Sequence, residues 1–198
     1  MDTATVSSPA EPSHLQGIDS HLPALRWALD AVPDGPVLEF GGGLHSTPAI
    51  INAGRDLVTI EPHPDWRMWL RIKYGWEHHT YEVYESFYSG DLPQREWAVV
   101  LIDHQPYEGD EWSWLEARAE ALSVVRGWCG IALVHDWHIG QGHHERLVRS
   151  YQHAAWYAPS DGSFHTALCS DSIDVAAATI QGGYVYATRD TAPKEFPN

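Results

Sequence analysis

The chain has 198 residues, enough for one domain with a core of its own, and its 43% hydrophobic content with ten tryptophans excludes a disordered chain. Its formal net charge of −15 opposes binding to a phosphate backbone, so we expect a small-molecule partner and no nucleic acid. The same charge is equally compatible with a role in solubility alone.

Membrane and secreted classes are also disfavoured. No apolar run reaches the length of a membrane helix, and the N-terminus lacks the basic and apolar regions of a signal peptide. Cys129 and Cys169 lie in apolar, strand-like segments and are interpreted as buried thiols in a reducing compartment. We therefore expect a cytoplasmic protein without a membrane partner.

The first half of the chain alternates helices with short strands. Residues 1–16 are rich in Ser, Pro, Ala and Thr and are expected to form a flexible lead-in to a single domain over residues 17–198. Asp65 is expected to cap a helix that Gly75 ends. The elements expected here are helix 18–32, strand 37–40, helix 47–53, strand 57–60, helix 65–74 and strand 80–84.

The second half contains the most apolar strands. The run 97–102 is uninterrupted, which is typical of a parallel strand buried on both faces, and it is followed by Asp103. The run 130–134 is a second such strand and leads into His135 and Asp136. The remaining expected elements are helices 111–126 and 144–156, strands 166–169, 175–180 and 184–188, and a hairpin turn at 181–183.

Alternating strands and helices predict an α/β fold. We expect a Rossmann-like, doubly wound sheet that is mostly parallel, with helices on both faces and a C-terminal antiparallel hairpin strand at one edge. Ligands of such sheets bind at the carboxyl ends of the strands. Four acids are placed there by the expected strands: Glu39, Glu61, Asp103 and Asp136. We expect them to line one rim of the sheet, although acids are also common in ordinary loops.

A glycine-rich corner follows the first strand. Three glycines at 41–43 lead into 46–48 (Ser-Thr-Pro), the pattern of a helix start. Small residues let a ligand approach the backbone, and the helix N–H groups face it, so the corner favours a nucleotide-type site. Glu61 follows the second strand about twenty residues beyond Glu39, where a carboxylate binds the hydroxyls of a ribose. Ser46 stands where the Gly-x-Gly-x-x-Gly pattern has its third glycine, which disfavours a nicotinamide enzyme.

At these residues the chain resembles the class I S-adenosylmethionine-dependent methyltransferases. Residues 39–43 are similar to the first motif of the family, and 60–66 to the run around its ribose-binding acid. Residues 101–103 are similar to the motif after the fourth strand, and 127–136 to the glycine turn and fifth strand. The resemblance covers roughly residues 37–137 and implies S-adenosylmethionine as cofactor.

The resemblance also implies which residues bind the cofactor. Glu61 would accept both ribose hydroxyls, and Glu39 would face the ammonium group directly or through water. Thr47, or Ser46 beside it, would bind the carboxylate; without the resemblance Thr47 is a helix cap and the glycines are a plain turn. The implied cofactor-binding residues are Glu39, Gly41, Gly42, Gly43, Thr47, Glu61, Ser86, Asp103 and His104.

The remaining candidate residues would contact the adenine edge or take part in the chemistry at the acceptor. Ser86 and His104 are candidate contacts to the adenine edge, and Asp103 would lie where the sulfonium, the methyl group and the acceptor meet. His135 or His138 is a candidate metal-free general base, because the pKa of histidine is near neutrality. These histidines are equally compatible with simple hydrogen bonds to loops.

A narrower resemblance is to metal-dependent O-methyltransferases that act on catechol-type hydroxyls. Asp103 and Asp136 match their two acidic ligands, so Asp103, Asp136 and His138 are a candidate site for Mg²⁺, Mn²⁺ or Fe²⁺. Trp137 stands at the position of the amide ligand and Pro106 at that of the lysine. Because the third expected ligand is missing, we favour the metal-free base.

Three functions follow from this interpretation. The favoured one is methyl transfer to a small-molecule acceptor, most simply at oxygen. The second is another use of S-adenosylmethionine, as in a cyclase, lyase or decarboxylase, and the third is a cofactor-binding subunit without catalysis. The sequence pattern does not identify the acceptor, and it is compatible with a homodimer.

Overall fold

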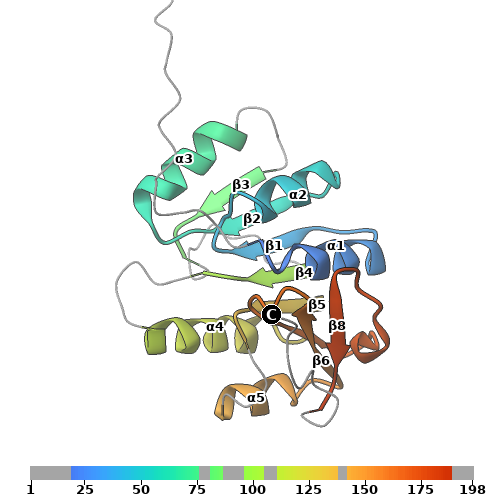
Figure 1. Ribbon diagram of the computed structural model, residues 1–198. Helices are drawn as coiled ribbons and strands as arrows, with labels where there is room; N and C mark the ends of the chain where they lie inside the picture. The colour runs from blue at the N-terminus through green and yellow to red at the C-terminus, as the bar shows by residue number, and fades with distance from the viewer. Residues whose placement is uncertain (1–18, 76–80, 87–95, 105–110, 138–141, 189–198) are drawn as a thin grey trace, which may run out of the picture.

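The computed structural model describes residues 19–75, 81–86, 96–104, 111–137 and 142–188, which form one sheet with helices on both faces (Figure 1). The helices are α1 (Leu22–Ala31), α2 (Ser46–Asn52), α3 (Pro64–Tyr74), α4 (Glu111–Val125), α5 (His143–Val148) and the 3₁₀ helix η1 (Val175–Ala177). The strands are β1 (Val37–Phe40), β2 (Leu57–Ile60), β3 (Tyr81–Tyr84), β4 (Trp97–Ile102), β5 (Cys129–His135), β6 (His153–Pro159), β7 (Thr166–Ser170) and β8 (Gly183–Tyr186).

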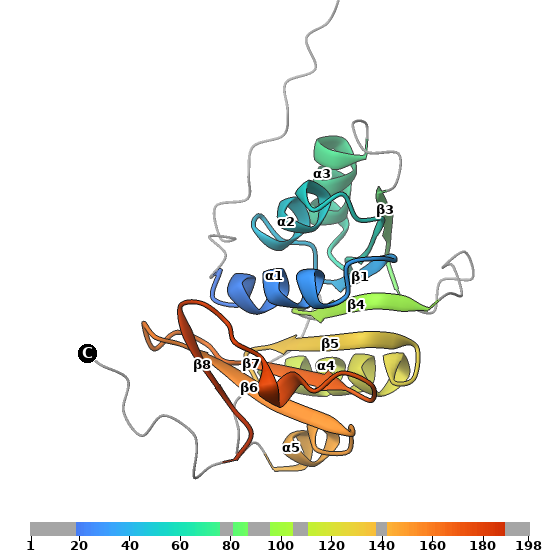
Figure 2. The ribbon, with the colours of Figure 1, turned by 90° about the vertical axis from the view of Figure 1, so that its right-hand side faces the viewer.

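The strand order is β3-β2-β1-β4-β5-β7-β6-β8. Neighbouring strands from β3 to β5 pair in parallel, whereas β7 is antiparallel to β5 and to β6, and β6 is antiparallel to β8. In the view turned by 90°, the red β8 lies beside β6 (Figure 2). The expected Rossmann-like sheet, mostly parallel with antiparallel C-terminal strands, is confirmed.

Strand alternation divides the core into two layers. Odd-numbered residues of the central strands, such as Val99 and Ile131, pack with α1, α2 and α3. Even-numbered residues, such as Val100 and Ala132, pack with α4 and with Val148 of α5. Both layers exclude solvent, which explains why β4 is apolar without interruption. The same alternation decides on which face the residues at the strand ends lie.

Among the helices of the described ranges, none is both long enough and apolar enough to cross a membrane.

The expected helix 144–156 is wrong in its second half. α5 ends at Val148, and β6 begins at His153. Trp156 packs in the core layer that contains α4, and Tyr157 packs in the opposite layer. Adjacent residues reach opposite layers only in an extended chain, so burial on both faces of the sheet outweighs the helical spacing of the sequence.

Three smaller expectations are also wrong. Residues 175–177 form η1 instead of a strand, because the Asp174 carboxylate caps this turn by accepting from the Ala176 N–H at 3.1 Å. β8 consequently pairs with β6, and residues 181–183 do not join two strands of a hairpin. The cap of α3 is His63, whose Nδ1 accepts from the Trp66 N–H at 3.4 Å, and not Asp65. The expected lead-in at 1–16 lies outside the described residues.

Candidate functional site

The candidate site lies at the carboxyl ends of the parallel strands. Glu61 follows β2, Asp103 follows β4, and His135 ends β5. Because these strands run in parallel, their carboxyl ends meet at one edge of the sheet. By strand alternation, the odd-numbered residues at this edge lie on the side of α1 to α3, and even-numbered residues such as His104 lie on the side of α4.

The glycine corner is fixed by contacts within the protein. Gly41 has a φ of 86°, and a Cβ there would lie 2.7 Å from the His104 Cα, so only glycine fits. The Gly42 N–H donates to Glu61 Oε2 at 3.2 Å, and the Gly42 carbonyl accepts from the Trp66 indole at 2.5 Å. The corner is therefore tied both to Glu61 and to α3 before any ligand binds.

Glu39 is completely buried inside β1 and does not face solvent. Its Oε2 accepts hydrogen bonds at 2.8 Å from the hydroxyls of Thr47 and Thr59. The Thr47 hydroxyl also accepts from the Gly43 N–H at 3.0 Å, so it links the glycine corner to Glu39. Burial raises the pKa of Glu39 to about 7, even though these hydroxyls favour the charged form. Contacts of Glu39 and Thr47 with a cofactor stay predictions.

The buried Glu39 carboxyl is expected to make stability fall as pH rises. In the unfolded chain the group loses its proton near its ordinary pKa of 4.5, but in the folded protein it does so only near 7. Between these values the unfolded state binds fewer protons, so folding becomes less favourable with increasing pH. We expect Glu39→Gln to remove on the order of 3 kcal/mol of this loss, measured by urea unfolding at pH 5 and pH 8.

Glu96→Gln is the matched control, because Glu96 is exposed at the start of β4. Its unfolding free energy should follow that of the wild type at both pH values. Equal pH dependence of wild type and Glu39→Gln would contradict the prediction.

Glu61 is buried between the glycine corner and the start of α3. Besides the Gly42 N–H, it accepts from the His63 N–H at 2.9 Å through Oε1. Burial raises the pKa of Glu61 to about 7, although these two backbone donors favour the carboxylate. Each oxygen keeps a further lone pair, so the carboxylate can still accept from two hydroxyls.

A cavity of about 230 Å³ lies on the α4 side of the sheet, and Ile60 and Pro62, the sequence neighbours of Glu61, line it. Its apolar wall includes Phe40, Ile60 and Ala121. Ser86 and His104, the two expected adenine contacts, both line it. Burial and the nearby Arg118 lower the pKa of His104 to about 4, so the imidazole in this wall is neutral.

Asp103 and His135 form the chemically most distinctive part of the site. His135 Nδ1 lies 3.0 Å from Asp103 Oδ1, and the Arg118 guanidinium donates to the same oxygen at 3.1 Å. Burial disfavours the Asp103 carboxylate, but the charges of His135 and Arg118 outweigh it and hold the Asp103 pKa below its ordinary range. Burial likewise disfavours a charged His135, but Asp103 outweighs it and raises the pKa of His135.

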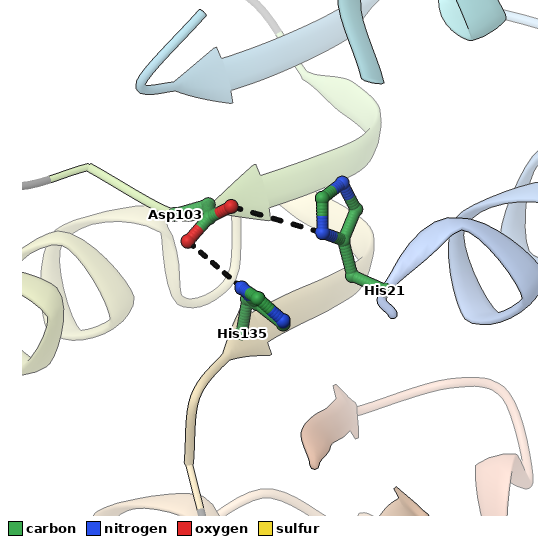
Figure 3. Close-up of side chains that lie close together, drawn as sticks. All are labelled: His21, Asp103 and His135. Atoms are coloured by element: carbon green, nitrogen blue, oxygen red, sulfur yellow. Dashed lines mark hydrogen bonds and ion pairs between the residues drawn. The ribbon is translucent and has the colours of Figure 1, made fainter. Parts of the chain in front are cut away.

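Sequence reasoning missed three residues of this cluster. Arg118 is 2% exposed and also donates to the His135 carbonyl at 2.6 Å. Ser20 and His21 come from the entry to α1; the Ser20 hydroxyl lies 2.7 Å from His135 Nε2, and His21 Nδ1 lies 3.7 Å from Asp103 Oδ2. Figure 3 shows Asp103 between the imidazoles of His21 and His135.

Two of the three residues expected to bind a cation, Asp103 and Asp136, contact an arginine in the structure. Arg118 Nη1 lies 3.5 Å from Asp136 Oδ2, so one guanidinium contacts both acids that were expected to bind a metal ion. Trp137 is buried and donates its backbone N–H to the His165 carbonyl at 3.3 Å, and His138 lies outside the described residues. This arrangement supplies a positive charge to the acids from the protein itself.

A different set of groups has spacing compatible with a metal ion. Ligand atoms of His21, Asp103 and His135 lie within 4.8 Å of one another. In the structure Asp103 instead accepts from His135 and Arg118.

The fold is similar to those of solved methyltransferases. A methyltransferase from Pyrococcus furiosus has a TM-score of 0.55 and 14% identity, over 86% of this chain and 92% of that one. The N-terminal domain of human METTL16, solved in complex with SAH, has a TM-score of 0.57 and 7% identity, over 83% and 73%. The chain spans about half (52%) of the CcbJ methyltransferase from Streptomyces caelestis, at a TM-score of 0.46 and 15% identity over 63% of this chain.

Neither a protein-family model nor a curated protein sequence matches the chain. The similarity to solved structures therefore concerns the course of the backbone. Together with the strand order, it confirms the fold expected from the sequence. The chain has the Rossmann-like fold of the class I S-adenosylmethionine-dependent methyltransferases.

Proposed function

We propose that the protein is an S-adenosylmethionine-dependent methyltransferase that acts on a hydroxyl oxygen of a small-molecule acceptor. The observation that carries this proposal is the Asp103–His135 pair, because it lies at the same sheet edge as Glu61 and the cavity. A histidine oriented by a carboxylate is a general base that works near neutral pH. At this edge of the sheet, such a base can deprotonate the hydroxyl group of an acceptor.

The groups along the edge fit the parts of S-adenosylmethionine. Apolar walls at Phe40 and Ile60, with polar groups at Ser86 and His104, suit an adenine ring. Glu61 follows Ile60 directly and offers a carboxylate to the ribose hydroxyls. When bound, the cofactor supplies an electrophilic methyl group on a sulfonium.

His135 is assigned as the base and Asp103 as the group that orients it. Asp103 holds Nδ1, which leaves Nε2 to accept a proton from the acceptor hydroxyl. The Ser20 hydroxyl lies 2.7 Å from Nε2, so this nitrogen has hydrogen-bond geometry for a hydroxyl, and an acceptor hydroxyl would take the place of Ser20 there. Asp103 then stabilises the imidazolium, and Arg118 keeps Asp103 ionised and in place.

A small acceptor suits the charge of the chain. With a net charge of −15, the surface disfavours an extended phosphate backbone. A metal-free reaction is favoured because Arg118 contacts both Asp103 and Asp136.

The first test is the binding of S-adenosylmethionine, measured by titration calorimetry. The wild type is expected to bind, and Glu61→Ala to bind about 10–100-fold more weakly, because two charge-assisted hydrogen bonds to the ribose are lost. Glu82→Ala, an exposed glutamate on β3, is the control and should bind like the wild type. A wild-type protein that does not bind the cofactor would overturn the proposal.

Methyl transfer itself is then followed with a labelled methyl group. Label is expected in the low-molecular-weight fraction of a cell extract, together with one S-adenosylhomocysteine per methyl transferred. Label in RNA, or methylthioadenosine as the product, would contradict the assignment.

A further inference from the structure

Ser20 has a contact that methyl transfer does not require. Its hydroxyl is 2.7 Å from His135 Nε2, on the opposite side of the imidazole from Asp103, which lies 3.0 Å from Nδ1. Hydroxyl, imidazole and carboxylate are thus hydrogen-bonded in series, as in the Ser-His-Asp arrangement of acyl-transfer enzymes. The three residues come from the entry to α1, the end of β5 and the residue after β4.

We propose that Ser20 is a nucleophile and that the protein also hydrolyses small, uncharged carboxylic esters through an acyl-Ser20 intermediate. This activity goes beyond the proposed methyl transfer and does not use its cofactor. It requires a base, an orienting acid, a group that stabilises the developing oxyanion, and access for the ester.

The base and its orienting acid are held firmly. Arg118 donates to Asp103 Oδ1 and to the His135 carbonyl, so it fixes both residues from α4. When Asp103 accepts from Nδ1–H, neutral His135 has its lone pair on Nε2, directed at the Ser20 hydroxyl. This is the tautomer that a nucleophilic serine needs.

His21 provides the group that faces a developing negative charge. It follows Ser20 in the chain, is 4% exposed, and its ring lies 4.7 Å from that of His135. Neither ring nitrogen of His21 has a hydrogen-bond partner within the described part of the chain. A buried N–H donor without a partner is costly, and an ester carbonyl oxygen becoming an oxyanion would supply one. Burial lowers the pKa of His21 to about 4, so the ring acts as a neutral donor.

The cluster reaches solvent through its acids, and Ser20 itself is 8% exposed. The side chains of Asp103 and Asp136 are 24% and 32% exposed. Phe164 is 42% exposed, and its ring lies 6.2 Å from that of His135. An uncharged ester is favoured over an acid, because the carboxylates of Asp103 and Asp136 repel an anion.

Ester hydrolysis through acyl-Ser20 consumes only the ester and one water molecule. Ser20 Oγ forms a bond to the acyl carbon while its proton moves to His135 Nε2. The ester C–O bond then breaks, and the alcohol leaves with that proton. Water, deprotonated by His135, attacks the acyl carbon, and Ser20 regains its proton as the carboxylic acid leaves.

A small dialkyl fluorophosphate tests the nucleophile, because it phosphorylates activated serines irreversibly. One adduct on Ser20 is expected, located by peptide mass spectrometry, with release of fluoride. Ser20→Ala should abolish it, and His135→Gln should slow it by at least about 10³-fold. p-Nitrophenyl acetate should give one equivalent of nitrophenol in a burst, which Ser20→Ala removes.

Ser123→Ala is the matched control, because Ser123 Oγ donates to the backbone carbonyl of Ala119 at 2.9 Å and not to a histidine. It should label like the wild type. Circular dichroism verifies that Ser20→Ala is folded. Absence of a Ser20 adduct on the wild type, or equal labelling of His135→Gln, would overturn the proposal. Cofactor binding by the same samples separates this failure from a failure of the proposed methyl transfer.

Discussion

Replacing His135 with glutamine is expected to slow methyl transfer about 10²–10⁴-fold while leaving cofactor binding nearly unchanged. Glutamine retains a polar group at the end of β5 but cannot take up a proton. The measurement is kcat at saturating acceptor, with calorimetry of the cofactor on the same samples. Unchanged kcat in His135→Gln would exclude His135 as the base.

The pH profile gives a sharper criterion for the same base. His135 must be neutral to accept a proton, and Asp103 raises its pKa against the effect of burial. The groups that face His135 are Asp103, Asp136, Arg118 and His21. The rate should therefore rise with pH through this raised pKa. In Asp103→Asn the rising limb of the rate should move to lower pH. Burial and Arg118 lower the pKa of His135, and this variant removes one of the two carboxylates that raise it.

The control for both variants is His153→Gln. His153 lies at the start of β6, with its Nδ1 3.8 Å from Asp174, so it is another histidine beside an acid. Its removal should leave kcat and the pH profile unchanged. A comparable loss in His153→Gln would show that the assay reports on general destabilisation.

Replacing Arg118 with methionine is expected to destabilise the protein by about 3–5 kcal/mol. Methionine keeps much of the aliphatic volume but removes the cation from Asp103 and Asp136, and leaves the His135 and His104 carbonyls without their donor. For a protein of this length the loss corresponds to a decrease in Tm of about 10 °C. Chemical unfolding at pH 7 measures it.

Arg126→Met provides the comparison. Arg126 is also paired with an acid, at 3.4 Å from Asp171, but its side chain is 40% exposed. Water solvates the separated charges there, so the loss should stay within about 1 kcal/mol. Equal effects of the two substitutions would mean that Arg118 does not hold the rim acids. Arg118→Lys should fall between them, since it keeps the charge without the planar fork.

The sheet was predictable because its signals are local. The apolar runs that became β4 and β5 are continuous, and each is followed by an acid that marks its carboxyl end. Parallel pairing then brings Asp103 next to His135 without further information. The region after α5 was not predictable in this way, since Trp156 and Tyr157 fit helical spacing as well as a strand buried on both faces.

The rest of the site depends on contacts that local patterns do not encode. Ser20 is 115 positions from His135 in sequence, and it falls inside the helix expected over 18–32, where no local pattern marks it as a site residue. The sequence does contain one sign that Arg118 is buried. It occupies a position on the apolar stripe of α4 with Leu115, Leu122 and Val125, where an arginine needs acids to compensate its burial. Its partners, however, come from β4 and β5, which only the folded chain reveals.

The odd–even division of the sheet places consecutive residues of the rim on opposite faces of the sheet. His104 and the cavity lie on one side of the sheet, whereas Asp103 and His135 lie on the other. Asp103 and His104 are nevertheless neighbours in sequence. Substitutions in α1 therefore act on the layer that contains Asp103 and His135, and the cavity lies across the sheet from that layer. An insertion of a single residue in β4 would exchange the two sides and destroy both at once.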